Sequence, residues 1–347
     1  MAGRTGHEAG GLWPHLRRAR AARHLGWHLA LGLGVGVALL ALVARDVPPG
    51  LVWVPLRQAD PWLTALALLT VLLTTAAKVG RWWVLFPVGS QPPLPALGRA
   101  LLVGQAVNAA LPARLGDAAR VYLISRAAPT SLAMALGTVA AEKWFDVLLL
   151  LVCAALASGL AALPGWLGVS LVALAAGGLL AFLLAVLLSR PRVLAWSQHW
   201  LSRLPGGVWL GAVLQQGVAG LVALRQPRPA ALAFAWSAAA WALAASTNYV
   251  LFSAFGLRLS VGAALALLVL LQVGVAPPSS PGRLGVFHAL TVVALTAFGV
   301  ERPVSLAYAT VLHLVVYVPQ IVLGGISGSL DGWSRRRAAN AGNRSAD

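Results

Sequence analysis

Long apolar runs, separated by short polar or basic stretches, dominate the hydrophobic pattern of this chain. A helix needs about 17–25 mainly apolar residues to cross the hydrocarbon core of a bilayer. The pattern therefore predicts an all-α membrane protein, a helix bundle with full spans. The expected spans cover residues 26–44, 61–78, 131–163, 166–188, 230–254 and 304–323.

Two further apolar regions, 96–126 and 261–300, are interrupted near their middle. The interruption reads PARLG at 112–116 and PGRLG at 281–285. Proline ends a helix because it lacks an N–H group and clashes with the preceding turn, and glycine lets the backbone reverse. Non-helical backbone at membrane depth is tolerated only where protein or water surrounds it. We therefore expect six full spans and two re-entrant helical hairpins, with eight complete spans as the alternative.

The two interrupted regions occupy similar places in two halves of the chain, about 61–163 and 230–326. After each break comes a second apolar segment, a turn, and a span that opens with Ser-Leu-Ala, at Ser131 and Ser305. The charge pattern places the two breaks on opposite faces of the membrane. The sequence thus predicts an inverted-topology repeat, a frequent plan of secondary transporters.

Composition and charge agree with a membrane location. Hydrophobic residues make up 59% of the 347 residues and charged residues only 10%, against about 25% charged in soluble domains. The net charge is +17, but Lys and Arg cluster at the ends of apolar runs, as the positive-inside rule predicts. No nucleic-acid partner is therefore expected, and both termini are predicted to lie on the cytoplasmic side of the cell membrane.

The basic segments outside the spans also follow this orientation. We expect basic cytoplasmic tails at 1–25 and 327–347, on either side of a transmembrane domain at 26–326. Residues 190–228 hold five Arg and no acid, and are predicted to form an amphipathic helix on the cytoplasmic membrane face. At the end of the second span, Lys78, Arg81 and the Trp82–Trp83 pair are expected to anchor the helix at the interface. The single cysteine, Cys153, excludes an intramolecular disulfide and a cysteine-based zinc site, and no metal or cofactor is expected.

The backbone breaks supply candidate binding chemistry. Pro112, Gly116, Pro281, Gly282 and Gly285 are expected to open the helices. Freed N–H groups at a helix start can hold an anion, and an arginine can hold phosphate in a forked geometry. Arg283, which has no acidic neighbour in sequence, is the first candidate. The full expected substrate-binding set is Arg283, Arg114, Arg120, Asn108 and Lys143, with Asn108 bonded to the broken backbone.

Acidic and histidine residues near the breaks are candidates for charge balance or proton coupling: Asp117, Glu142, Asp146 and His288. Alternatives remain open for each. Residues 114, 117 and 120 share one helical face and could form a local ion-pair network. Glu142 and Asp146 could act as acid and base, or could pair with Arg114 or Arg120. His288 and His313 are each expected to be buried histidines with satisfied hydrogen bonds rather than protonation switches.

Three motifs in order resemble a known family: NxxLPxRxGDxxR from Asn108 to Arg120, EKxxD from Glu142 to Asp146, and SPGRLGVF at 280–287. They resemble the transmembrane domain of lysylphosphatidylglycerol synthases and stand-alone UPF0104-type membrane proteins, over about residues 26–326. The resemblance implies a lipid-flippase-like bundle that acts on aminoacylated phospholipids or polyprenyl-linked glycolipids. Asp117 and His288 stand where the family usually or often has Glu. The soluble synthase domain does not follow the last span, so synthase activity is not expected.

Three functions follow from these observations. The first is translocation of an anionic, aminoacylated phospholipid or a polyprenyl-linked glycolipid, with membrane lipids as partners. The second is a membrane-embedded enzyme that modifies a lipid headgroup, although HExxH, GxSxG and Asp-rich metal motifs are missing from the sequence. The third is a non-catalytic partner of a glycosyltransferase or aminoacyl-lipid synthase, for which the basic segment at 190–228 would provide a docking surface.

Overall fold

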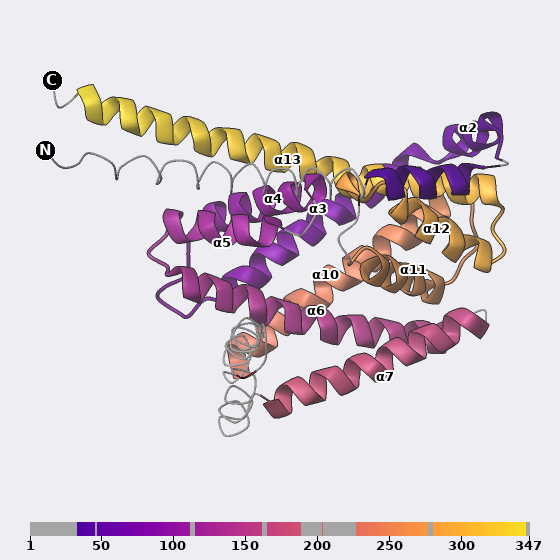
Figure 1. The fold of residues 1–347 in the computed structure, drawn as a ribbon, viewed down its shortest axis with the longest axis horizontal. Helices are drawn as coiled ribbons and strands as arrows, with labels where there is room; N and C mark the ends of the chain where they lie inside the picture. The colour runs from indigo at the N-terminus through magenta and orange to yellow at the C-terminus, as the bar shows by residue number, and fades with distance from the viewer. Residues whose placement is uncertain are drawn as a thin grey trace, which may run out of the picture.

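The computed structural model describes residues 33–45, 47–111, 115–161, 165–188, 203, 227–276 and 280–344, and all regular structure among them is helical (Figure 1). Four described helices are long and apolar enough to cross a membrane. They are α3 (Pro61–Val84), α6 (Leu132–Leu160), α10 (Pro227–Ala254) and the part of α13 (Arg302–Arg344) that ends at Leu330. These helices confirm the multi-spanning helical bundle and four of its predicted spans.

The remaining predicted spans correspond to less simple elements. A helix over Leu33–Ala44 covers the described part of the first predicted span, and α7 (Gly165–Leu188) coincides with the fourth. After Ala44 the chain bends by 87° into α2 (Pro49–Gln58), and the bent pair would make a fifth span if both helices cross together. Pro48, Pro49 and Asp60 would favour a short polar loop between the first two predicted spans, but most of this segment is helical. Pro49 is compatible with α2 because it stands in the first turn, where its missing N–H is not needed.

The segments predicted outside the spans can be compared with the structure only in part. The tail at 1–25 and most of the amphipathic segment at 190–228 lie outside the described residues. At the other end, α13 continues as a helix to Arg344, through most of the segment predicted as a separate tail, and it projects beyond the bundle in Figure 1.

Both predicted backbone breaks are confirmed. The first separates α4 (Leu94–Ala110) from α5 (Leu115–Ala127), and the second separates α11 (Val261–Gly274) from a single 3₁₀ turn, η2 (Pro281–Arg283), and α12 (Val286–Ala297). The chain reverses at each break, because α4 packs against α5 and α11 against α12. At the first reversal Gly104 lies against the backbone of Gly116, and at the second Gly274 lies against Leu290.

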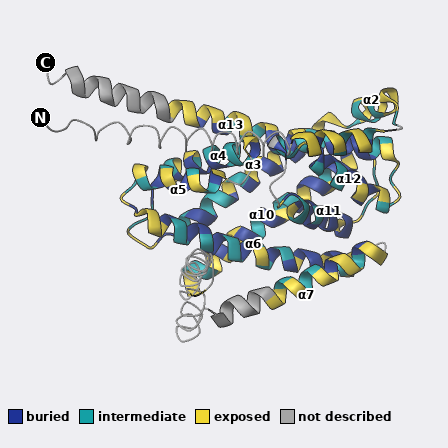
Figure 2. Ribbon diagram, in the orientation of Figure 1, coloured by how far each residue is buried: buried dark blue, intermediate teal, exposed yellow. Residues whose placement is uncertain are grey.

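The two halves of the chain pack against each other in a reciprocal manner. Helices α3 and α10 run antiparallel: the Asp60 N–H donates to the Ala254 carbonyl oxygen at 2.9 Å, and the Thr70 and Thr247 hydroxyl oxygens lie 2.8 Å apart. Helix α4 packs on α13, and α11 packs on α6. The largest buried core cluster therefore joins residues of α3, α4, α10, α11, α12 and α13. Many residues on the outside of the bundle are exposed (Figure 2). Large apolar side chains are frequent among the exposed residues, as a lipid-facing surface requires.

The close approach of α4 and α5 gives a stability prediction. A methyl group at residue 116 would overlap the Gly104 carbonyl oxygen and crowd the Asn108 side chain. Gly116→Ala is therefore expected to destabilise the protein by about 1–3 kcal/mol. The measurement is unfolding of the purified protein in mixed micelles. Gly98→Ala, on the partner helix α4 and with no atom within 4 Å of the new methyl group, is the matched control. Equal stability of the two variants would show that the α4–α5 contact is not tight.

Candidate functional site

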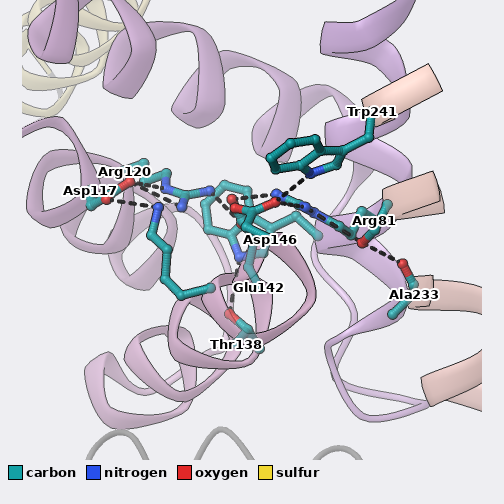
Figure 3. Close-up of polar contacts among 11 residues, drawn as sticks. Arg81, Asp117, Arg120, Thr138, Glu142, Asp146, Ala233 and Trp241 are labelled. Carbon is teal, nitrogen blue, oxygen red and sulfur yellow. Dashed lines mark hydrogen bonds and ion pairs between the residues drawn. The ribbon is translucent and has the colours of Figure 1, made fainter. Parts of the chain in front are cut away.

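A buried ion-pair network joins α3 to α6 (Figure 3). Arg81 donates from Nη2 to Glu142 Oε1 at 2.6 Å and from Nη1 to Asp146 Oδ1 at 2.5 Å. The same Asp146 oxygen accepts a hydrogen bond from Trp241 Nε1 of α10 at 3.3 Å. The Arg81 side chain is only 1% exposed. Since a buried charge is costly unless it is paired, the carboxylates of α6 are what allow Arg81 to lie inside the bundle.

The network continues through the start of α5. Arg120 donates to Glu142 Oε2 at 2.9 Å and to Asp117 Oδ1 at 3.0 Å, and Lys143 Nζ lies 3.2 Å from Asp117 Oδ2. The pairing of Glu142 with Arg120 and of Asp117 with Arg120 confirms the ion-pair interpretation of these residues. Guanidinium groups thus bind both carboxylates of α6, Glu142 and Asp146.

The prediction that the end of the second span anchors the helix at the membrane interface is wrong for Arg81 and Trp82. Arg81 and Trp82 are buried, and Trp82 Nε1 donates to the Thr138 hydroxyl at 3.0 Å. The Arg120 guanidinium carbon lies 4.9 Å from the centroid of the Trp82 ring. The sequence predicted that this span ends at Lys78. The helix instead runs six residues further, to Val84, with its charged residues turned inward.

Each break is held by side-chain contacts. At the first, Asn108 Oδ1 accepts a hydrogen bond from the Gly116 N–H at 2.7 Å, which confirms the predicted hydrogen bond between Asn108 and the backbone at the break. At the second, the Ser280 hydroxyl donates to the Leu284 carbonyl oxygen at 2.6 Å, and His313 Nε2 lies 2.8 Å from the Gly282 carbonyl oxygen. Side chains from α4 and α13 thus fix the geometry of the non-helical backbone.

The second break has a left-handed backbone at three positions: Gly282 (φ 67°), Arg283 (φ 55°) and Gly285 (φ 81°). Glycine adopts this region without strain, but for another residue it costs about 1–2 kcal/mol. Arg283 is the only described non-glycine residue with a positive φ. Strain of this kind persists where the surrounding structure imposes it, and it is concentrated at functional sites.

Arg283 and Lys78 differ from the other basic residues of the interior. Arg283 Nη1 donates to the Tyr317 hydroxyl at 3.2 Å, and its guanidinium carbon lies 5.9 Å from the Tyr317 ring centroid. Neither Arg283 nor Lys78 forms an ion pair with any carboxylate among the described residues. Two positive charges therefore lie outside the ion pairs of the described residues.

Both of these cations line a partly open cavity beside the two breaks, which consists of two adjoining compartments. The larger compartment has a volume of 690 Å³ and the smaller 250 Å³, and the two share Lys78, Asn108 and Arg283 in their walls. Binding pockets for small ligands usually measure about 300–1,000 Å³. The wall that the two compartments share also carries amide side chains: Gln105, Asn108 and Gln272. The larger compartment also reaches the whole ion-pair network.

The other predicted site residues have varied positions. Gly116 is buried beside Gly104, and Lys143 remains 45% exposed at the edge of the network. His288 is buried, its ring centroid lies 5.1 Å from that of His313, and its Nδ1 has no hydrogen-bond partner among the described residues. Pro112 and Arg114 lie outside the described residues, and the backbone of Pro281 opens η2.

Sequence reasoning did not identify several residues of the cavity wall. Lys78 and Arg81 were interpreted as interfacial, and the polar residues Gln105, Gln272 and Tyr317 were not singled out. A signal was present, however. Each of these polar side chains stands within or at the end of an apolar segment, where a polar group usually faces a cavity or a partner.

Comparison with known proteins agrees with this geometry. The family described as "Lysylphosphatidylglycerol synthase TM region" matches residues 29–324. A UPF0104 membrane protein from Methanothermobacter thermautotrophicus is 25% identical over 314 residues, which cover 83% of this chain and 91% of the relative. The match extends over both broken helix pairs and the ion-pair network, and the chain therefore belongs to the family of the lysylphosphatidylglycerol synthase transmembrane region.

Proposed function

We propose that this protein moves a lipid with a phosphate-bearing headgroup across the cytoplasmic membrane by holding that headgroup in the cavity between the two broken helix pairs. The observation that carries the proposal is the pair of uncompensated cations, Lys78 and Arg283, in that cavity. Charged groups inside a membrane protein are costly and normally mark the path of a substrate or an ion. The substrates considered are an aminoacylated phospholipid and a polyprenyl-linked glycolipid.

The cavity also suits an amphiphile because its walls are not uniformly polar. Beyond the ion-pair network, the larger compartment is lined by apolar side chains of α6, α7, α10 and α11 that could accept the start of a hydrocarbon chain. They are Val147, Leu150, Leu174, Ala240, Ala244 and Val273. A headgroup and the first part of its lipid tail would therefore meet matching surfaces in one continuous space.

The reciprocal packing supports an inverted repeat as the framework for this movement. In that repeat α3, α4, α5 and α6 correspond to α10, α11, α12 and α13. The corresponding helices α3 and α10 run in opposite directions, and the first hairpin helix of each half packs on the last helix of the other half. Inverted repeats place a binding site at their interface, with access alternating between the two membrane faces. The hairpins would then be re-entrant, one from each face.

The proposed function is tested by lipid translocation in vesicles that contain the purified protein. A fluorescent anionic lipid is placed in both leaflets, and the fraction that an impermeant quencher reaches is followed with and without a proton gradient. We expect the quenched fraction to exceed the outer-leaflet fraction only in vesicles with the protein. Quenching no greater than in vesicles with an unrelated membrane protein, under both conditions, would overturn the proposal.

The proposed orientation gives a separate prediction. In a background without Cys153, cysteines at Gln58 and Pro303 are expected to react with an impermeant reagent added to intact cells. Cysteines at Gln91 and Arg203 are expected to react only after permeabilisation, because basic segments stay in the cytoplasm. Cys153 is buried and is replaced by alanine to keep the packing similar. Labelling of Arg203→Cys in intact cells would contradict the inverted-repeat topology.

A further inference from the structure

The charges that line the larger cavity compartment are not balanced. Its wall includes five basic and three acidic side chains, so two positive charges are in excess. All three carboxylates take part in the ion-pair network described above, in which Arg81, Arg120 and Lys143 match Asp117, Glu142 and Asp146 one for one. The excess charge therefore belongs to Lys78 and Arg283.

The neutral polar groups beside these cations favour hydroxyl groups. Amide side chains of Gln105, Asn108, Gln272 and Gln320, together with the Thr74 and Thr247 hydroxyls, line one or both compartments. Amides and hydroxyls both donate and accept hydrogen bonds, as do the hydroxyl groups of glycerol or a sugar. Gln105 Oε1 is buried and has no hydrogen-bond partner among the described residues, so an acceptor remains for a ligand hydroxyl once that side chain turns toward the cavity.

We infer that Lys78 and Arg283 together hold the phosphate of a lipid whose remaining headgroup is uncharged and hydroxylated, such as a glycerol or sugar phosphate. This inference rests on the proposed function and narrows its substrate class. A headgroup with a net positive charge, such as a lysyl ester, would bring further positive charge into a cavity that already holds two cations in excess, and would be repelled. The inference therefore separates this chain from a carrier of cationic aminoacylated phospholipids.

One feature could favour an ammonium group instead. Asp146 is 31% exposed, and no partner is found for its second oxygen, Oδ2, among the described residues. Its charge is nevertheless matched by Arg81, which is bound to its first oxygen. An ammonium ion at Oδ2 would have to lie near Arg81 and Lys78 at the same time, and like charges at close range repel strongly where little water is present.

The test is competitive lipid binding to the full-length protein in detergent, followed by native mass spectrometry. The probes share the same acyl chains: phosphatidylglycerol, lysyl-phosphatidylglycerol and phosphatidylcholine, with inorganic phosphate as a soluble anion. We expect phosphatidylglycerol to bind at least about tenfold more tightly than either other lipid. Lys78→Gln and Arg283→Gln are each expected to remove most of this preference, whereas Arg126→Gln, at an exposed position outside the cavity, should keep it.

Three results would overturn the inference. One is equal or tighter binding of lysyl-phosphatidylglycerol, above all if Asp146→Asn abolishes it, which would place an ammonium at Asp146. Another is phosphatidylglycerol preference unchanged in both Lys78→Gln and Arg283→Gln. The third is displacement of phosphatidylglycerol by inorganic phosphate at equal concentration, which would identify a site for a soluble anion.

Binding and transport separate this inference from the proposed function. Translocation that favours lysyl-phosphatidylglycerol would leave the transport function standing and refute the charge argument. If the protein shows the expected binding preference but moves none of these lipids in vesicles, the transport function is refuted and the charge argument stands.

Discussion

Replacement of Arg283 by alanine is expected to reduce lipid translocation nearly to the background of protein-free vesicles. Hydrogen bonds to a charged group contribute about 1.5–3 kcal/mol each, and a forked guanidinium makes two of them with one phosphate. Loss of one such bond corresponds to about a tenfold or greater effect on binding. Arg283→Lys keeps the charge but not the fork, and should therefore retain a measurable fraction of transport.

The left-handed backbone at Arg283 requires an additional variant. Alanine would carry the same strain at φ 55° without the guanidinium contact to Tyr317. Arg283→Gly removes the side chain and relieves that strain, so its fold should be at least as stable as that of the alanine variant. Arg302→Ala, which removes an exposed arginine at the start of α13, is the charge-matched control. Full transport by a folded Arg283→Gly protein would refute the role of Arg283.

The broad architecture was predictable because its signals are local. Hydropathy alone identifies α3, α6, α10 and α13, since each is a continuous apolar run. Pro and Gly near residues 112 and 281 mark the two breaks because they act on the backbone where they stand. The Asp117–Arg120 pair was predictable for the same reason, as residues three apart share a helix face.

Local sequence patterns mispredict the location of a residue when its position depends on a partner far away in the chain. Lys78 and Arg81 look like the end of a span because a charge in lipid is unfavourable. Arg81 is stabilised by Glu142 and Asp146, more than sixty positions later in the chain, and no local pattern reveals that pairing. The contact of Arg283 with Tyr317, 34 residues away, is similar. For the same reason the sequence could propose an arginine at the second break but not Lys78, the second cation that lines the same cavity.

The element α2 shows a different failure. Three prolines, Pro48, Pro49 and Pro55, suggest a loop when they are counted as helix breakers. Their positions matter more than their number, because Pro48 precedes the helix and Pro49 opens it. Only Pro55 stands in the helix interior. Helix α2 then packs against α13, which supplies tertiary contacts that the local sequence does not indicate.

Replacement of Arg81 by methionine is expected to destabilise the protein by about 3–5 kcal/mol, the usual cost of removing one partner from a buried ion pair. Methionine fills similar space but leaves Asp146 with only the Trp241 hydrogen bond and Glu142 with only Arg120. The measurement is equilibrium unfolding in mixed micelles. Arg126→Met is the control, because Arg126 is exposed and its side chain lies over the exposed ring of Tyr122, an interaction of about 0.5–1 kcal/mol.

A second substitution distinguishes lost charge balance from lost packing. Arg81→Met leaves one negative charge in excess within the network, and Asp146→Asn removes it while keeping the shape of the side chain. The double variant should therefore be more stable than Arg81→Met alone, and the two effects should not add, as is usual for residues in one network. If the effects add, or if Arg81→Met unfolds no more easily than Arg126→Met, the charge network does not hold α3 to α6. In the expected case, the network is the fixed framework that lets Lys78 and Arg283 remain available for a ligand, because it engages every carboxylate of the cavity wall.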